Sequence, residues 1–298
     1  MNQQTAERRK KTKKKKKVEY EIKPDAKAEK MYYNYMRSVI RDISKDVRNF
    51  LIPLLKVNKP QYTMDGWADD LTVFFGMLRA RYSSFLFRER VKTDVQMPLS
   101  MVESKTTAQF LKGVNRAVGV DVRGALKEEG IDQIMRATLS HNVSLVTNMS
   151  DDYLNRIENI VYDGIDKGRA PSVIAKGLQS AVGISERRAK VIARDQVAKL
   201  NGAIDAERSE NLGIKYYRWS TSNDRRVSGN PSGAYPNAKI KCYRIAQQDV
   251  GYGVGVFTYK DGAEYAGETK LHPATAHIGC RCRRIPLIEG VNFELPSK

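Results

Sequence analysis

Apolar side chains recur every three or four residues through most of residues 26–204, which is the spacing of helices that bury one face. The pattern predicts one long amphipathic helix over residues 26–56, ending near Pro53, and a second helical region over residues 64–95. Each of these apolar faces needs a partner surface. The first part of the chain is therefore expected to be an assembly of packed helices.

The helical spacing continues between residues 102 and 145, where glycines interrupt it. Glycine weakens a helix interior, so we expect short helical pieces divided at Gly113, Gly119, Gly124 and Gly130. Together these segments predict an extended, mainly helical domain over residues 18–148. Its aromatic side chains at helical spacing are expected to form a core rather than a binding site.

Three capped helices are predicted next. Ser150, which two aspartates follow, has the features of a helix N-cap, and Gly168 is expected to end that helix. A short helix is expected over residues 171–182, and Ser185 is expected to cap a longer helix that ends at Gly213.

After that glycine the pattern changes to one of short strands and turns. Residues 214–219 are predicted to form a strand, and residues 254–265 a β-hairpin whose turn is Asp261-Gly262. We expect residues 149–290 to form a small α+β module, followed by a short tail over residues 291–298. The fold class predicted for the whole chain is α+β.

Composition argues against several classes of protein. The chain has 298 residues, of which 41% are hydrophobic and 29% charged, so it can bury a core. No apolar run approaches the roughly 18 residues of a membrane span. The basic N-terminus leads into a polar segment, so we expect no secretory signal and synthesis inside the cell. Three cysteines are too few for a secreted disulfide scaffold.

The first 17 residues concentrate positive charge: they hold nine cations and one anion, a net of +8 out of the chain's +18. The cations are Arg8, Arg9, Lys10, Lys11, Lys13, Lys14, Lys15, Lys16 and Lys17. Like charges that bury nothing predict a disordered tail over residues 1–17. The run lacks side chains that read bases, so we expect it to bind double-stranded DNA through phosphate, independently of sequence. A solubilising tail or a nuclear localisation signal is the alternative.

Three short motifs follow one another in the C-terminal half. They are Arg188-Ala189 with Ile192-Ala193-Arg194, then Trp219, Thr221, Asp224 and Arg226-Val227, and finally Cys280-Arg281-Cys282. In this order they resemble the phage Mu F-like head-morphogenesis family, whose pattern is RA-x-x-IAR-T-E, W-x-T-x-x-D-x-R-V and CRC. The resemblance covers about residues 150–286.

The chain departs from that pattern at two places. Asp195-Gln196 stands where the family has T-E, and the histidine often found after the second motif is absent, with Ser228 and Asn230 in its neighbourhood. The resemblance implies a low-copy structural protein of the phage head, without a defined catalytic activity. The implied partners are the portal, other capsid proteins and packaged double-stranded DNA. The implied location is the interior of the virion head near the portal, after synthesis in the host cytoplasm.

Two other functions stay open at this point. Mu F-like modules also occur as delivery platforms ahead of toxin or enzyme domains, including ADP-ribosyltransferases. About a dozen residues follow Pro286, and residues 18–148 show no catalytic constellation, which favours the structural role. Charge alone also fits a non-specific DNA-binding protein of unrelated fold.

The motif residues by themselves also favour structural roles. Trp219, at the end of a predicted strand, is expected to anchor a small core. Asp224, which precedes Arg225 and Arg226, can fix a turn through side-chain to backbone bonds and one ion pair; a catalytic carboxylate is the less favoured alternative. The sequence shows no nucleophile elbow, P-loop or dinucleotide-binding glycine motif, so we predict no enzyme activity.

All the cysteines and two of the three histidines lie within 41 residues of one another. They are Cys242, His272, His277, Cys280 and Cys282. In extended chain, residues i and i+2 face the same way, so Cys280 and Cys282 can offer two thiolates to one zinc ion, with Cys242 and a histidine completing a tetrahedron. The alternatives are buried, reduced cysteines or an oxidised pair in the mature virion. Structural zinc is the one cofactor that the sequence suggests.

Overall fold

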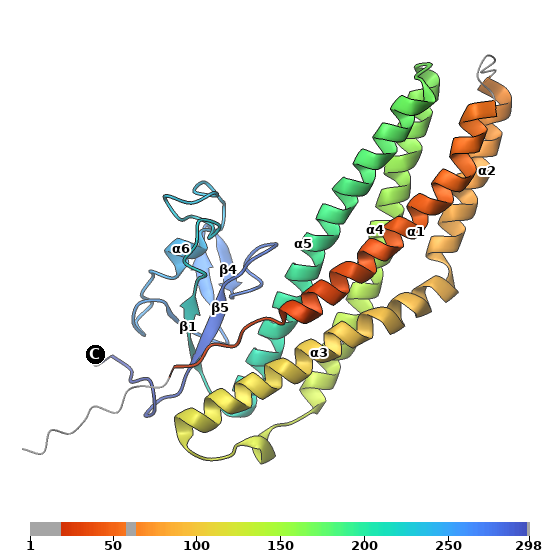
Figure 1. Cartoon of the computed structure of the whole chain (residues 1–298). Helices are drawn as coiled ribbons and strands as arrows, with labels where there is room; N and C mark the ends of the chain where they lie inside the picture. Colours follow the sequence, from red (N-terminus) through yellow and green to blue (C-terminus); the bar gives the residue numbers. More distant parts are fainter. Residues whose placement is uncertain (1–18, 58–63, 297–298) are drawn as a thin grey trace, which may run out of the picture.

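The computed structural model describes residues 19–57 and 64–296. Within them, five long helices form an elongated bundle, and a small lobe of short strands and loops lies beside one end of it (Figure 1). This arrangement confirms the predicted α+β class with a helical N-terminal region. The basic run from Arg8 to Lys17 lies outside the described residues. No helix among those described combines the length and the hydropathy of a membrane span.

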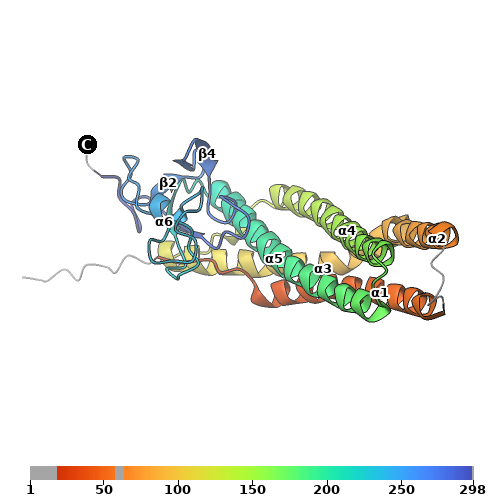
Figure 2. The same cartoon turned by 90° about the horizontal axis from the view of Figure 1, so that it is seen from above.

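The bundle forms because each long helix carries an apolar stripe that only another helix can cover. Its helices are α1 (Ala26–Val57), α2 (Met64–Ser83), α3 (Phe85–Val118), α4 (Glu129–Asp166) and α5 (Pro171–Asn211), with the 3-10 turn η1 (Arg123–Ala125) between α3 and α4. The helix α5 packs against α1, α3 and α4 (Figure 2). Tyr32, Phe75 and Tyr153 are among the fully buried side chains of the shared core.

Two helices are longer than the sequence predicted. The helix α4 continues through Ser150, because the Ser150 hydroxyl donates to the carbonyl of Val146 at 2.9 Å instead of capping a helix start. The helix α5 likewise continues through Ser185, which is buried in its middle. The two predicted N-caps, and with them the separate short helix over residues 171–182, are therefore wrong.

Glycine has two different roles in the bundle. Gly113 does not break α3; a Cβ there would lie 2.1 Å from the Tyr20 ring, so the glycine makes room for an aromatic side chain. Gly130 also lies inside a helix, α4. Gly168 and Gly213 do end helices as predicted, with φ angles of 58° and 69° that favour glycine. The predicted breaks at Gly113 and Gly130 are wrong.

The predicted helix over residues 64–95 is in fact two helices. They meet at Ser84, whose Oγ accepts a hydrogen bond from the backbone amide of Phe87 at 3.1 Å and so caps α3. The first helix, α1, was expected to end near Pro53; it includes this proline and ends at Val57.

The lobe contains two small antiparallel sheets. Its strands are β1 (Tyr216–Ser220), β2 (Val256–Thr258), β3 (Ala263–Tyr265), β4 (Glu268–Leu271) and β5 (Arg283–Leu287), and α6 (Cys242–Ile245) is a single helical turn. The first sheet has the order β2-β1-β5, and the second pairs β3 with β4. The hairpin predicted over residues 254–265 is wrong, because β2 pairs with β1 and β3 pairs with β4.

The lobe has a core of its own, which also takes in chain from the N-terminal side. Tyr217, Trp219 and Phe257 are buried there together with Ile22 and, from α3, Phe110. Residues 19–25 run from the lobe to the start of α1 (Figure 1). The predicted domain boundary at residues 148/149 falls inside α4, and each of the two cores contains residues from both sides of it.

Candidate metal centre

Two thiols and an imidazole meet in the lobe. The ligand atoms of Cys242, His277 and Cys280 all lie within 4.8 Å of one another, and the two sulfur atoms are 3.9 Å apart. Both cysteines are buried, and His277 is half-buried. The structure thus brings together three of the five residues that the sequence marks as metal ligands.

Local hydrogen bonds hold these side chains in place. Cys242 is the first residue of α6, and its backbone amide donates to Ser228 Oγ at 3.2 Å. A turn brings the other two together, since the Cys280 amide donates to the His277 carbonyl at 3.2 Å. The Gly279 amide in that turn donates to the Asp195 carboxylate at 2.8 Å, which fixes the turn to α5.

The His277 ring is oriented by its two nitrogens. Nδ1 lies 3.0 Å from the carbonyl oxygen of Ile278, and Nε2 lies 3.2 Å from Ser228 Oγ. A carbonyl oxygen only accepts, so Nδ1 carries a hydrogen, which leaves Nε2 as the nitrogen that can act as a ligand. Hydrogen bonds with Cys242 and then Cys280 raise the pKa of His277 to about 11, and they exceed the opposing effect of burial.

The thiols influence one another in the same way. Hydrogen bonds from Cys242 and Cys282, and a further one from His277, hold the pKa of the Cys280 thiol well below its usual value despite burial. Hydrogen bonds with Cys242 and Cys280 raise the pKa of the Cys282 thiol, and burial adds to this rise. The arrangement therefore favours a thiolate at Cys280 beside a protonated imidazole and a neutral Cys282 thiol.

The fifth residue marked by the sequence, His272, lies elsewhere in the lobe. Its Nδ1 is 3.1 Å from the hydroxyl of Tyr217, and the two ring centroids are 6.0 Å apart. Burial, with the nearby charge of Arg284, lowers the pKa of His272 to about 4. The histidine is thus neutral at pH 7 and is bonded to the sheet rather than to the thiols.

The motif residue Asp224 connects its turn to the loop that carries the cysteines. Arg281 donates to both carboxylate oxygens, at 2.8 and 2.5 Å, and the amide and guanidinium of Arg226 donate to them at 2.8 and 3.0 Å. The bonds from Arg281 and then those from Arg226 hold the pKa of Asp224 well below its usual range. Arg281, between the two cysteines, is the partner that sequence reasoning missed.

Two more motif residues border this region. Arg194 of α5 lies 3.6 Å from the Glu29 carboxylate of α1, and it lines an open cavity of about 610 Å³ together with Arg226, Arg281 and His277. Trp219 is 3% exposed and packs edge-on against Phe257, with ring centroids 5.9 Å apart. Its burial agrees with the anchoring role expected for it.

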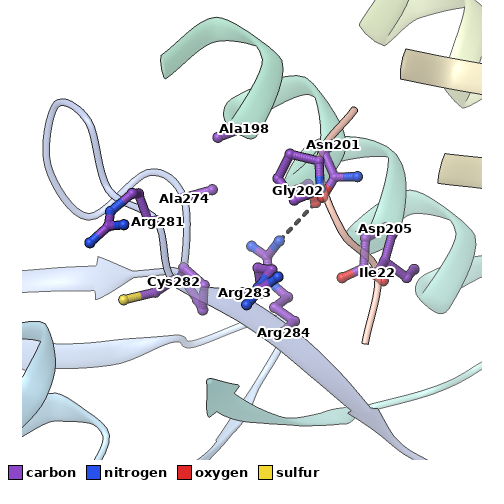
Figure 3. A pocket seen from close by; sticks show the side chains of 12 residues that line it. Ile22, Ala198, Asn201, Gly202, Asp205, Ala274, Arg281, Cys282, Arg283 and Arg284 are labelled. Carbon is purple, nitrogen blue, oxygen red and sulfur yellow. Dashed lines mark hydrogen bonds between the residues drawn. The ribbon is translucent and has the colours of Figure 1, made fainter. Parts of the chain in front are cut away.

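A buried polar cluster between α5 and the sheet has no counterpart in the sequence analysis. Arg284 donates to the carbonyl of Gly202 at 2.7 Å (Figure 3). Its guanidinium also lies over the ring of Tyr259, 5.5 Å from the centroid. Asp205 faces the same cluster, and burial raises its pKa to about 7, although Arg284 and a hydrogen bond from Tyr259 oppose the rise. A cavity of about 20 Å³ beside Asp205 has room for one water molecule.

The signal for this cluster was present but weak. Asp205 directly follows Ile204, which the helical period places in the core, so a carboxylate at that position borders the buried face. Its partner Arg284 comes from β5, far along the chain, and spacing does not reveal such a pair.

A comparison with known proteins covers this same part of the chain. Residues 155–285 match the family model described as phage Mu protein F like protein. These residues are a phage Mu F-like segment. The segment runs from the second half of α4 to β5 and includes every motif and metal-candidate residue described above.

One relative is a protein of Haemophilus influenzae (strain ATCC 51907 / DSM 11121 / KW20 / Rd) that carries the description "Uncharacterized protein". It is 30% identical over 130 residues, which is 43% of this chain and 29% of the relative. The chain therefore spans less than a third of the length of that protein. No solved structure matches the chain. The Mu F-like segment is consistent with a protein of phage head morphogenesis.

Proposed function

We propose that this chain is a structural minor head protein of a tailed phage, which associates with the portal and with packaged DNA while the head is assembled. The observation that carries the proposal is the Mu F-like match over residues 155–285. That segment provides both the lobe and α5, the helix that contacts three others in the bundle. The matched part is thus the structural centre of the chain.

The contacts of Asp224 support a structural rather than a catalytic role. Both oxygens of this carboxylate are engaged by Arg281 and Arg226, and its low pKa makes it a poor proton acceptor at neutral pH. What the bonds accomplish is to hold two loops of the lobe together.

Exposed apolar side chains on the bundle support a role in assembly. Val73 and Met77 of α2 are 63% and 67% exposed, and Phe85 and Leu86 at the start of α3 are 74% and 79% exposed. Large apolar side chains gathered on a surface are typical of sites that bind other proteins. In the proposed function they contact a capsid or portal protein.

The basic N-terminal run provides the DNA contact in this proposal. The first described residues are fixed to the lobe, because Glu21 accepts a hydrogen bond from Ser220 Oγ at 2.9 Å and forms an ion pair with Arg283, whose Nε lies 2.9 Å from the carboxylate. In the sequence, the last cation of the run, Lys17, stands two positions before Glu19, the first described residue. The cations of the run neutralise phosphate without reading sequence.

Mass spectrometry of purified phage particles tests the proposal. Particles are induced from the strain that carries the gene and separated into intact heads and emptied heads. We expect a few copies of this chain in each intact head, chemically cross-linked to the portal protein. Its absence from purified particles, with the major capsid protein detected in the same sample, would overturn the proposal.

A further inference from the structure

We propose that Cys242, His277, Cys280 and Cys282 bind one zinc ion that links the two loop regions of the lobe. The inference rests on the geometry of Cys242, His277 and Cys280, whose ligand atoms lie within 4.8 Å of one another, and it is independent of the proposed role in the phage head. The site is structural: all four ligand positions come from the protein, which leaves none for a substrate.

The distance between the sulfur atoms is that of a zinc site. With zinc–sulfur bonds of about 2.3 Å at a tetrahedral angle, two thiolate ligands lie about 3.8 Å apart. Cys242 Sγ and Cys280 Sγ are 3.9 Å apart. A disulfide would need about 2.05 Å, so these two thiols match a shared metal ion better than an S–S bond.

The hydrogen bond of His277 Nδ1 fixes the ring in a tautomer that can bind a metal through Nε2. Metal-binding histidines commonly donate the other ring N–H to a carbonyl or carboxylate, which fixes the ring and the tautomer. His277 does so through Nδ1, which donates to the Ile278 carbonyl at 3.0 Å and leaves Nε2 as the nitrogen for the metal. Ser228 Oγ, near Nε2, also accepts from the Cys242 amide and so connects two of the ligand residues.

In this proposal Cys282 is the fourth ligand, added to the three residues whose ligand atoms already lie within 4.8 Å of one another. It lies two residues after Cys280 and directly before β5, it is buried, and its thiol interacts with those of Cys242 and Cys280. The other histidine nearby, His272, is bonded to Tyr217 and is not part of the group. Three thiolates and one imidazole are a common donor set for structural zinc, and soft sulfur ligands disfavour magnesium and calcium.

The position of the site explains what the ion would do. Cys242 begins α6, after the long loop that follows β1, whereas the other three ligands lie in the loop before β5. Within the lobe, no described strand is longer than five residues. Small, loop-rich units of this kind commonly need a disulfide or a metal in addition to their apolar core.

Metal analysis of the full chain is the first test. The protein is purified without a polyhistidine tag in reducing buffer, loaded with zinc and dialysed against metal-free buffer. We expect about one zinc ion per chain, and cobalt(II) in its place should give the absorption spectrum of a tetrahedral, sulfur-rich site. A wild-type protein that retains no zinc, or that contains a disulfide between Cys242 and Cys280 by mass spectrometry, would overturn the proposal.

Single substitutions then assign the ligands. Cys280→Ser and His277→Gln should each abolish stoichiometric zinc binding, and Cys282→Ser should weaken it by more than about tenfold. His272→Gln is the matched control, because it alters a histidine of the same lobe outside the site and should leave the zinc content unchanged. Loss of zinc only in His272→Gln, or unchanged affinity in Cys282→Ser, would contradict the proposed ligand set.

Circular dichroism separates ligand loss from misfolding. The bundle supplies most of the helical signal, so each variant should keep its helical spectrum while losing the metal. In the wild type, removal of zinc by a chelator should lower the melting temperature, and added zinc should restore it. An identical melting curve with and without zinc in a protein that binds it would exclude the structural role.

Discussion

The helical bundle and the C-terminal lobe are built around apolar cores of different size. In the bundle, five long helices share one continuous apolar core, and ion pairs such as that between Arg37 and Glu186 lie at its surface. In the lobe, short strands surround a smaller core, and charged groups such as Asp205 and Arg284 are buried beside it. The bundle also buries charge, because Arg208 of α5 is 1% exposed and pairs with Glu128, so the two regions differ chiefly in the size of their apolar cores.

The largest expected effect comes from removing the anchor of the smaller core. Trp219→Ala should destabilise the lobe by about 3–5 kcal/mol, because the indole is buried against Phe257. Urea unfolding followed by circular dichroism measures the loss. Phe75→Ala, in the bundle core, is the matched large-to-small change. A loss below about 1 kcal/mol for Trp219→Ala would contradict the anchoring role.

The buried carboxylate of Asp205 should make the lobe sensitive to pH. Its pKa is raised to about 7 in the folded state from 3.8, so the folded state holds the proton more tightly. The stability that Asp205 contributes should therefore be greatest below about pH 4, fall as the pH rises towards 7, and then level off, by no more than about 4 kcal/mol in all.

Asp205→Asn tests the origin of that dependence. The variant cannot ionise, so its stability relative to the wild type should increase between pH 4 and pH 7, as measured by urea unfolding across a pH series. Asp69→Asn, which removes an exposed carboxylate from the bundle, is the control. A constant difference between wild type and Asp205→Asn at all pH values would show that the carboxylate is not the source.

A smaller effect is expected where the two regions meet. Gly113→Ala should cost about 1–3 kcal/mol, because the new methyl group would overlap the Tyr20 ring and displace it from α3. Gly76→Ala in α2 is the matched control: nothing lies within 4 Å of its added Cβ, and the change should stabilise the bundle by about 0.5–1 kcal/mol. If both variants were stabilised equally, the close packing of Tyr20 would be wrong.

The smallest effect on folding is expected from the basic N-terminal run. Deletion of residues 1–17 removes a net charge of +8 and should leave the melting temperature almost unchanged. DNA binding should weaken equally for all sequences, and the slope of log affinity against log salt, at most about −8 for nine cations, should become shallower. An unchanged salt slope would mean that the remaining +10 of the chain binds the DNA.

The sequence predicted the helices better than their ends. The five long helices lie in regions where apolar spacing predicted helix, but Ser150 and Ser185 show why capping signals mislead. A serine hydroxyl can bond to a carbonyl one turn back, as Ser150 does, and a serine can equally be buried inside a helix, as Ser185 is. Strand pairing was less accessible, because β1 pairs with β5, and the two are separated by the loops that carry the cysteines.

The candidate site was predicted only in part, because contacts between residues far apart in the sequence are not visible in their spacing. Spacing alone pairs Cys280 with Cys282 and places Cys242 within reach of both. It does not decide between the two histidines, since that choice depends on Tyr217, a residue 55 positions earlier in the chain that is bonded to His272. The bond between Asp224 and Arg281 is hidden by the same separation along the chain.

The pairing of β1 with both β2 and β5 also sets an order of events at the ribosome. All helices of the bundle core have been synthesised once α5 is complete, so that core can form while translation continues. The lobe cannot be completed until β5, near the end of the chain, has been synthesised. Until then Ile22 lacks part of the lobe core that covers it, and Glu21 lacks its ion-pair partner Arg283. A nascent chain stalled before residue 283 would therefore present a finished bundle with one open edge of β1.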